Sequence, residues 1–263
     1  MTQSIHIVDA FTEQLFAGNP AAVVIRNEWY SDDLMQKIAS ENNLAETAFL
    51  VQHNYAEYAI RWFSPLTEID FCGHATLAAS SVIFETQPTL TRLRFKTSSV
   101  GDLIIEKKPD GKISMTFPIR TLESPEAIPH ALLQALPEPP VKILRSVQAW
   151  HAIYDNEQAI YNCQPDLEQL KQLAPLDLVV SAPAENYDFV SRYFWPANGG
   201  DEDPVTGSIH ASLAPWWAKQ LGKSNLLAHQ ASRRGGTLYC EVQENNVIVS
   251  GYTKKYLTGE IIL

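Results

Sequence analysis

Two helix starts of similar character, about half a chain apart, constrain the fold of this sequence most strongly. The segment FCGHATLA places Gly73 before HATLAASSVIF, a run that is small and apolar nearly all round, and EDPVTGS places Gly207 before SIHASLAPWWAKQLG. A helix that is apolar on every side is enclosed by other elements. The two glycines lie 134 residues apart in a chain of 263 residues. This spacing predicts two similar halves, each with strands wrapped around one buried helix.

Short runs in which apolar and polar residues alternate cover much of the remaining chain, and they predict half-buried strands. These runs are 5–8, 21–25, 47–51, 58–63, 102–106, 112–117, 142–149, 178–181, 187–194, 237–242 and 247–250. Repeated prolines in FPIRTLESPEAIP, from Pro118 to Pro129, interrupt the strand pattern and indicate the seam between the halves. The predicted domains are 1–118 and 119–250, and the last strand, about 251–263, is expected to return to the first domain.

Helices are predicted at fewer places. Ser31 followed by two aspartates is typical of a helix start, because its side chain caps the first turn and the acids favour the helix dipole. This helix is expected to run to about Asn42, and a second helix is expected over 165–173, whose leucines share one face. Pro215 predicts a kink or a late restart in the helix that begins at Ser208.

The composition excludes several classes of protein. The net charge of −10 does not support binding to nucleic acid. Three cysteines without a Cys-x-x-Cys pair do not indicate a disulfide framework, which favours a reducing compartment. The N-terminal residues lack a basic region followed by an apolar region, and no apolar run reaches the roughly 18 residues of a membrane helix. We therefore expect a cytoplasmic protein with neither nucleic-acid nor membrane partners.

Glu46 is the first candidate for chemistry. It lies in NNLAETAFL, between a predicted helix end and a strand, and its neighbours are apolar. Burial disfavours the charged form of a carboxylate, so a carboxylate in such surroundings is a usable base near neutral pH. The alternative is a glutamate at a strand edge that faces water, which is the commoner situation for a charged residue beside apolar ones.

The two glycine-containing helix starts are candidate anion-binding sites. The backbone N–H groups at a helix start are unpaired and the dipole there favours anions, so the segment around Gly73 and His74 suits a substrate carboxylate. The alternative is a tight turn in which His74 only caps the helix. In the second half, Ser208 is a good N-cap by type and Asp203 could simply fix the turn. The functional alternative is that Asp203 and Ser208 project into a cleft shared with Glu46 and His74.

Other motifs give no sign of a cofactor or a metal. The chain has neither of the glycine-rich phosphate-binding patterns and no nucleophile elbow of the G-x-S-x-G type. Cys72 and His74 lack a second pair of ligands, so a structural zinc site is not expected.

Taken together, five segments resemble the phenazine-biosynthesis PhzF-like isomerase family. They are FAGNPAAVVI, NLAETAFLV, IRWFSPLTEIDFCGHATLA, RYFWPANGGDEDPVTGSIHASLAPWWAKQLG and SRRGGTLYCEV. The resemblance extends over nearly the whole chain and is weakest from about residue 121 to 188. It implies an α+β fold of the diaminopimelate-epimerase-like type. In that fold two pseudo-symmetric domains each wrap a mostly antiparallel sheet or barrel around a central helix, with the active site between them.

The resemblance also implies roles for individual residues. Glu46 corresponds to the catalytic acid or base of the family, and His74, Asp203 and Ser208 correspond to residues that orient the substrate and relay the proton. Gly73 and Gly207 correspond to residues whose backbone N–H groups donate to the substrate carboxylate. The expected site consists of these six residues. Members of the family are often homodimers, so a homodimer acting on a small carboxylate is expected.

Three functions are compatible with these residues. The leading hypothesis is cofactor-independent isomerisation, in which Glu46 moves a proton within a small cyclic or conjugated carboxylic or amino acid. The second is a racemase or epimerase that uses Cys72 as one base. Racemases of this superfamily use two cysteines, and the alignment on Thr206 and Gly207 places Pro204 at the second position, where no proton can be taken up. The third is a dimer that binds a small carboxylate without catalysis.

Overall fold

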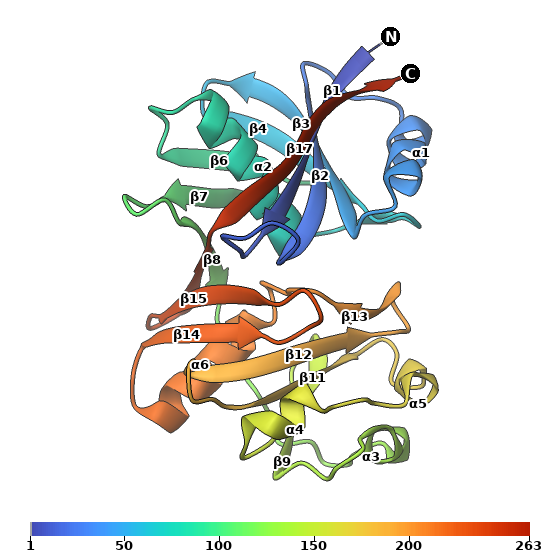
Figure 1. Cartoon of the computed structure of the whole chain (residues 1–263), viewed down its shortest axis with the longest axis vertical. Coiled ribbons are helices and arrows are strands. Elements are labelled where there is room, and N and C mark those ends of the chain that lie inside the picture. The colour runs from blue at the N-terminus through green and yellow to red at the C-terminus, as the bar shows by residue number, and fades with distance from the viewer. Residues whose placement is uncertain (1) are drawn as a thin grey trace. The chain divides into compact units, whose positions relative to one another are not determined.

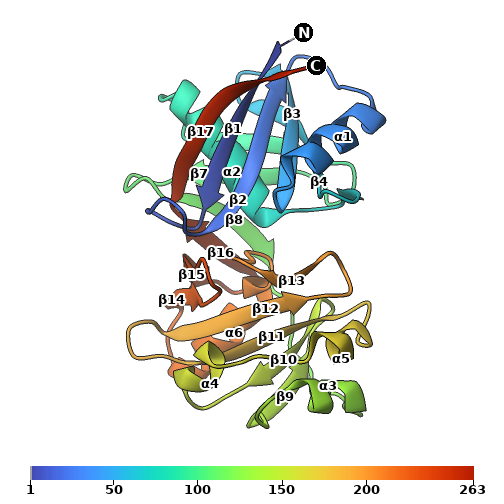
Figure 2. The same cartoon turned by 45° about the vertical axis from the view of Figure 1, so that its right-hand side comes forward.

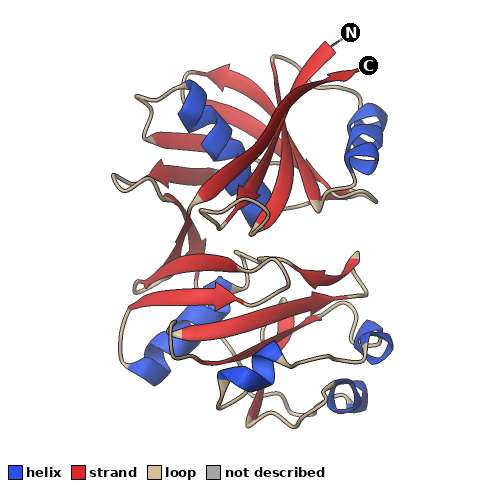
Figure 3. Ribbon diagram, viewed as in Figure 1, coloured by secondary structure: helices blue, strands red, loops and turns tan. Residues whose placement is uncertain are grey.

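The structure, a computed structural model, describes residues 2–263 and has a mixed α+β fold (Figure 1). Strands outnumber helices, as Figure 3 shows. The predicted α+β class is therefore confirmed. No helix within 2–263 combines the length and the apolar character needed to cross a membrane.

The chain divides into two compact units. The first contains the chain up to Thr116 together with Ser250–Leu263, and the second is Phe117–Val249. The chain passes from the first unit to the second within strand β8 (Ile113–Pro118) and returns within strand β16 (Asn246–Gly251).

The first unit is a set of strands around one buried helix. Its other strands are β1 (Thr2–Ala10), β2 (Asn19–Arg26), β3 (Glu46–Asn54), β4 (Glu57–Phe63), β5 (Glu68–Ile69), β6 (Arg92–Lys96), β7 (Leu103–Lys107) and β17 (Thr253–Ile262), and its helices are α1 (Asp32–Asn42) and α2 (Gly73–Thr86). Strand β1 pairs antiparallel with β2 and with β17, so the last strand of the chain lies beside the first. Strands β2 and β3 are parallel and are joined through α1.

Helix α1 forms as its sequence predicts. The Ser31 side chain accepts a hydrogen bond from the backbone N–H of Leu34, and two aspartates occupy the first turn. Asn43 ends the helix in the left-handed conformation, with φ of 47°. An asparagine tolerates this conformation better than most residues and is a common helix end. After this turn the chain enters strand β3, whose first residue is Glu46.

Helix α2 is enclosed, as predicted from its composition. Its residues 73–80 are all buried, and it packs against β1, β2, β3 and β17 (Figures 1 and 2). The two buried hydroxyls on it are satisfied locally, because Thr76 and Ser80 each donate to the carbonyl four residues earlier. A polar group inside a core must be paired in this way to avoid a desolvation cost of roughly 1–3 kcal/mol.

The second unit has its own sheet and its own long helix. Its elements are α3 (His130–Ala135), β9 (Lys142–Arg145), β10 (Ala149–Ile153), α4 (Glu157–Tyr161), α5 (Leu167–Lys171), β11 (Asp177–Pro183), β12 (Phe189–Trp195), β13 (Gly200–Asp203), α6 (His210–Leu221), β14 (Asn225–Gln230) and β15 (Gly236–Val242). Strands β10 and β11 are parallel, as are β12 and β14, while the other pairs within the unit are antiparallel.

Two predictions for the second unit are wrong. The predicted strand 142–149 is broken at Ser146, whose hydroxyl accepts hydrogen bonds from the backbone N–H groups of Gln148 and Ala149. A serine that bonds the backbone in this way replaces the strand by a turn. The second long helix begins at His210 and not at Ser208, because residues 207–212 first make tighter i to i+3 bonds.

Helix α6 continues through Pro215, so it has no late restart. Proline lacks the N–H that would bond the carbonyl of Ala211. That carbonyl accepts instead from the backbone N–H of Arg120, at 3.0 Å. Arg120, two residues after the end of β8, thus satisfies the group that the proline leaves without its usual partner.

The enclosed position of α2 makes the stability of the protein sensitive to its packing. Leu77 has 0% of its surface exposed. We expect Leu77→Ala to lower the free energy of unfolding by about 2–5 kcal/mol, since it leaves a cavity in a tightly packed core. Leu66→Ala is the control, because Leu66 is 74% exposed and should change stability by less than about 0.5 kcal/mol. Urea unfolding of both variants measures the difference, and equal effects would contradict the enclosure of α2.

Candidate active site

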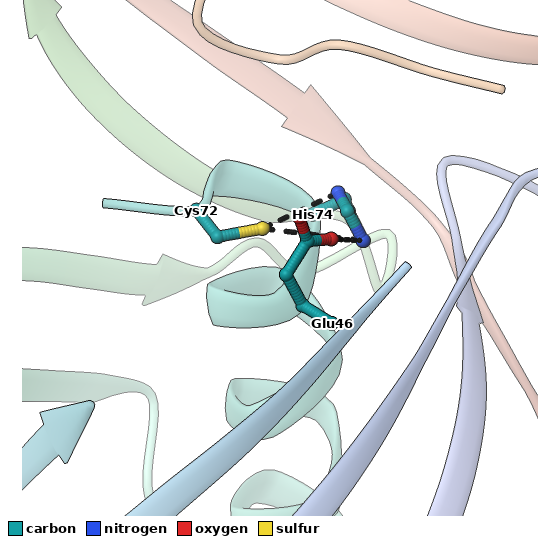
Figure 4. Close-up of side chains that lie close together, drawn as sticks. All are labelled: Glu46, Cys72 and His74. Carbon is teal, nitrogen blue, oxygen red and sulfur yellow. Dashed lines mark hydrogen bonds and ion pairs between the residues drawn. The ribbon is translucent and has the colours of Figure 1, made fainter. Parts of the chain in front are cut away.

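Glu46 lies at the beginning of β3 and is buried. Its backbone pairs with Ala21 of β2, and the side chain is only 5% exposed. The alternative of a glutamate that faces water is therefore wrong for this structure. The preceding turn after α1 directs the carboxylate toward the first turn of α2, where Figure 4 shows it beside His74 and Cys72.

His74 is the direct partner of this carboxylate. Its Nε2 lies 2.9 Å from Oε2 of Glu46, and the imidazole is also 5% exposed. Within residues 2–263, however, Glu46 Oε2 has no donor aligned well enough for a hydrogen bond. A buried carboxylate oxygen that lacks an aligned donor costs free energy, and in native structures such atoms are uncommon and need an explanation.

The protonation of His74 follows from its neighbours. Burial lowers the pKa of His74, but its electrostatic and hydrogen-bonding interactions with Cys72 and Glu46 outweigh this effect and raise the pKa well above its ordinary value of 6.5. We attribute the increase to Glu46, because burial raises the pKa of the Cys72 thiol to about 11 and so keeps it neutral near pH 7. The site therefore combines a carboxylate with an imidazolium.

Asn19, in β2, contacts the other nitrogen of the ring. Its Nδ2 lies 3.0 Å from Nδ1 of His74. An amide nitrogen can donate to a neutral ring, and the amide oxygen, after a half turn of the side-chain amide, can accept from a protonated ring. Asn19 therefore suits either protonation state of His74. Sequence patterns do not select Asn19, because a single asparagine between a glycine and a proline matches no catalytic motif.

Cys72 occupies the N-cap position of α2. It makes no side-chain capping bond, and its Sγ lies 3.4 Å from Nδ1 of His74. Donor atoms of Glu46, Cys72 and His74 all lie within 4.8 Å of one another, a combination of oxygen, sulfur and nitrogen that a divalent cation could use. The sequence predicts no metal and no cofactor here, and this stays a prediction.

In the second unit, the segment 203–208 is a tightly bonded turn. The carboxylate of Asp203 accepts from the hydroxyl of Thr206. The buried amide of Gln230 bonds the same turn three times, accepting from the Thr206 N–H and donating to the Thr206 hydroxyl and to the Asp203 carbonyl. Asp203 thus fixes the turn, as the simpler interpretation expects, while its role toward a substrate stays a prediction.

Ser208 is not the N-cap of α6 that its residue type predicts. Ile209 holds the N-cap position, and the Ser208 hydroxyl instead accepts a hydrogen bond from Nε2 of Gln148, at 3.0 Å. Gly207 is buried beside it. The structure therefore brings Glu46 and His74 together in the first unit, and it holds Asp203, Gly207 and Ser208 on one segment of the second.

A family model described as phenazine biosynthesis-like protein, the PhzC-PhzF family, matches residues 8–260 of the chain. The chain belongs to the PhzC-PhzF family. The predicted family membership is thereby confirmed.

Known members of the PhzC-PhzF family match this chain over its full length. An uncharacterized isomerase of Pseudomonas aeruginosa is 42% identical over 264 residues, with 100% of both chains covered. The human phenazine biosynthesis-like domain-containing protein is 35% identical over 293 residues, with 99% of both covered. Among solved structures, the PhzF family protein of Enterococcus faecalis has a TM-score of 0.94 and 40% identity, and again 100% of both chains is covered.

The pairing of His74 with Glu46 predicts a dependence of stability on pH in this PhzC-PhzF protein. Because the folded-state pKa of His74 is raised, its stabilisation is complete below about pH 6.5 and is lost as the pH rises through the folded-state pKa. We expect the stability advantage of the wild type over His74→Gln to shrink with rising pH, by at most about 1.4 kcal/mol per pH unit for one proton.

Urea unfolding between pH 5.5 and 9 measures this advantage. In a Glu46→Gln background the His74→Gln substitution should lose this dependence, because the charge that raises the pKa of His74 is gone. An advantage that stays constant across the range in the wild-type background would contradict the assignment of an imidazolium to His74.

Proposed function

We propose that this protein is a cofactor-independent isomerase that moves a proton within a small, cyclic or conjugated carboxylic or amino acid, with Glu46 as the catalytic base. The observation that carries the proposal is the buried Glu46 oxygen, 2.9 Å from an imidazole nitrogen and without an aligned donor. The isomerase class is supported by three relatives, 42%, 43% and 38% identical over the whole chain, whose names call them isomerases.

The first step is removal of a proton from carbon. The C–H bond breaks and an O–H bond forms on Glu46, while the electron pair enters the conjugated system and its carboxylate. A base that is held in place in this way accelerates proton transfer by roughly 10²- to 10⁴-fold. The adjacent His74, as an imidazolium, stabilises Glu46 while the carboxylate is charged.

The second step returns the proton to a different carbon. In one route the acid is Glu46, which is now protonated. In the other route His74 donates the proton of its Nε2–H, and Glu46 then transfers its own proton to the imidazole. In both routes one C–H bond is lost and one is formed, so substrate and product have the same composition. The reaction needs no oxidant and no reductant.

The developing negative charge needs donors that are in place beforehand. The start of α2 at Gly73 has no side-chain cap, so its first backbone N–H groups and the helix dipole are available to an anion. In this proposal the backbone N–H groups at Gly207 also donate to the anion. Asp203 and Ser208 orient the substrate. Preorganised donors of this type are commonly the largest single contribution to catalysis.

The proposal predicts that Glu46→Gln loses proton transfer. The assay follows the uptake of solvent deuterium by mass spectrometry. The panel contains cyclic and aromatic amino acids together with dienoic acids, and 2,5-cyclohexadiene-1-carboxylate is one of the dienoic acids. For the acid that exchanges fastest with the wild type, we expect a loss of about 10²- to 10⁴-fold, because glutamine keeps the shape but removes the base. Glu41→Gln, an exposed acid on α1, is the matched control and should keep its rate.

Two outcomes would count against this assignment. Glu46→Gln protein that exchanges deuterium at the wild-type rate would show that another group is the base. Saturable binding of a small carboxylate without exchange of any proton would favour the third hypothesis, a non-catalytic binding protein.

A racemase or epimerase that uses Cys72 is the second candidate, because the thiol lies 3.4 Å from His74. A pKa of about 11 makes this thiol a poor base at neutral pH, unlike the thiolates of reactive cysteines. We expect Cys72→Ser to keep the exchange rate within a few-fold of the wild type. A collapse of exchange, with Glu46→Gln still active, would instead support the racemase. Measuring both variants on the same acid separates the two functions.

The expected homodimer and the cytoplasmic location remain part of the proposal. They come from the family resemblance and from the composition, and sedimentation of the full-length protein tests the first of them.

A further inference from the structure

Gln148 connects Ser208 to a chain of polar groups inside the second unit. It lies in the turn between β9 and β10, and its side chain is half-buried. Its Oε1 accepts from Nη1 of Arg120 at 2.8 Å. Its Nε2 donates to the hydroxyl of Ser208 at 3.0 Å and to the hydroxyl of Tyr193 at 3.1 Å.

The chemistry of these neighbours fixes the orientation of the amide. A guanidinium has donors only, so the atom of Gln148 that faces Arg120 must be the oxygen. Both protons of the amide nitrogen are then committed, one to Ser208 and one to Tyr193. The Tyr193 hydroxyl can only accept from Gln148, because its own proton is donated to the carboxylate of Asp177.

The same accounting fixes the direction of the Ser208 hydroxyl. Its oxygen accepts the Gln148 proton, so its own proton points elsewhere. Across the described chain, 2–263, this proton has no protein acceptor. A half-buried hydroxyl held in this way is a donor prepared for a ligand.

The network contains one cation, Arg120, and one carboxylate, Asp177, whose nearest contact in the network is the Tyr193 hydroxyl. Arg120 bonds the opposite end of the same amide, and it forms no ion pair with a carboxylate within residues 2–263. Its positive charge is therefore not cancelled by a contacting acid. A hydrogen bond to a carboxylate is about twice as strong as one to a neutral acceptor.

We infer that Gln148 is a positioning residue, which holds the Ser208 hydroxyl so that it donates to a carboxylate oxygen of the ligand. This inference rests on the proposed function, in which Ser208 contacts the substrate. It adds the residue that acts through Ser208 and the chemical class of the atom that Ser208 recognises.

The test is a double-mutant cycle on the binding of benzoate, a small cyclic carboxylate that cannot react. Calorimetry would compare the wild type with Ser208→Ala, Gln148→Met and the double variant. We expect each single variant to bind about 10-fold more weakly, in line with loss of one hydrogen bond to a charged group. The double variant should be no weaker than either one. Gln158→Met, a matched change at an exposed glutamine on α4, should bind as the wild type does.

Several results would overturn the inference. If Gln148→Met adds its effect to that of Ser208→Ala, its role is merely structural and does not act through Ser208. If either single variant binds benzoate as tightly as the wild type, the chain from Gln148 through Ser208 to the ligand is broken. Wild-type protein that takes up no benzoate would overturn the assignment of a carboxylate acceptor.

A second measurement needs no ligand. In ¹⁵N-labelled wild-type protein the side-chain amide protons of Gln148 should show nuclear Overhauser contacts to both Ser208 and Tyr193, and Ser208→Ala should shift one of the two protons more than the other. Contacts from these protons to Arg120 instead would reverse the amide and overturn the inference. The deuterium exchange of Glu46→Gln is independent of both experiments, so failure of the proposed base and failure of the Gln148 assignment are distinguishable.

Discussion

A carboxylate and an imidazole that meet away from solvent set the requirements for the first unit. Moving either charge out of water costs several kcal/mol, and the pair recovers this cost only if its geometry is held by the surrounding elements. Glu46 is held at the beginning of β3 by its pairing with β2, and His74 is held in the first turn of α2, which the strands enclose. The 2.9 Å separation is therefore a property of the backbone arrangement. A flexible pair on the surface would not keep this geometry.

The enclosure of α2 also removes the first turn of this helix from solvent. Small side chains such as alanine let the strands approach the helix on several sides, which removes water from the helix start. Hydrogen bonds and charges are stronger where water is excluded. The N-cap residue, Cys72, is buried and does not cap the helix with its side chain. In this first turn, the side chain of His74 contacts Glu46 and Asn19.

Local chemistry in the sequence was enough to predict those elements whose ends are decided locally. The α1 helix is an example, since Ser31 and the two following aspartates suffice to begin it. The strand predicted over 142–149 failed because Ser146 competes for the backbone through its hydroxyl, and the pattern of apolar residues does not register this competition. The start of α6 was misplaced by two residues for a similar reason. Ser208 has a tertiary partner, Gln148, that draws its hydroxyl away from the cap.

The candidate site was predictable only in part. From local sequence alone, a glutamate between a helix end and a strand is more commonly exposed to water, and the burial of Glu46 becomes visible only in the packed structure. Asn19 and Gln148 were missed because their roles consist of single hydrogen bonds to residues 55 and 60 positions away. No pattern of period two or 3.6 carries such information. The family resemblance pointed to Glu46, His74 and Ser208, but not to the residues that hold them.

The two helix starts, similar in sequence, differ in chemistry, and this difference bears on the reaction. His210, near the start of α6, is fully buried, its Nδ1 donates to the Thr206 carbonyl, and its ring packs against Phe189. Burial lowers the pKa of His210 to about 4, so it stays neutral where His74 is charged. No carboxylate contacts it within the described residues. Of these two histidines, only His74 therefore lies beside a carboxylate with which it can exchange a proton. Under the proposed function the acid and the base both come from the first unit, and two equivalent bases, one from each helix start, are not expected.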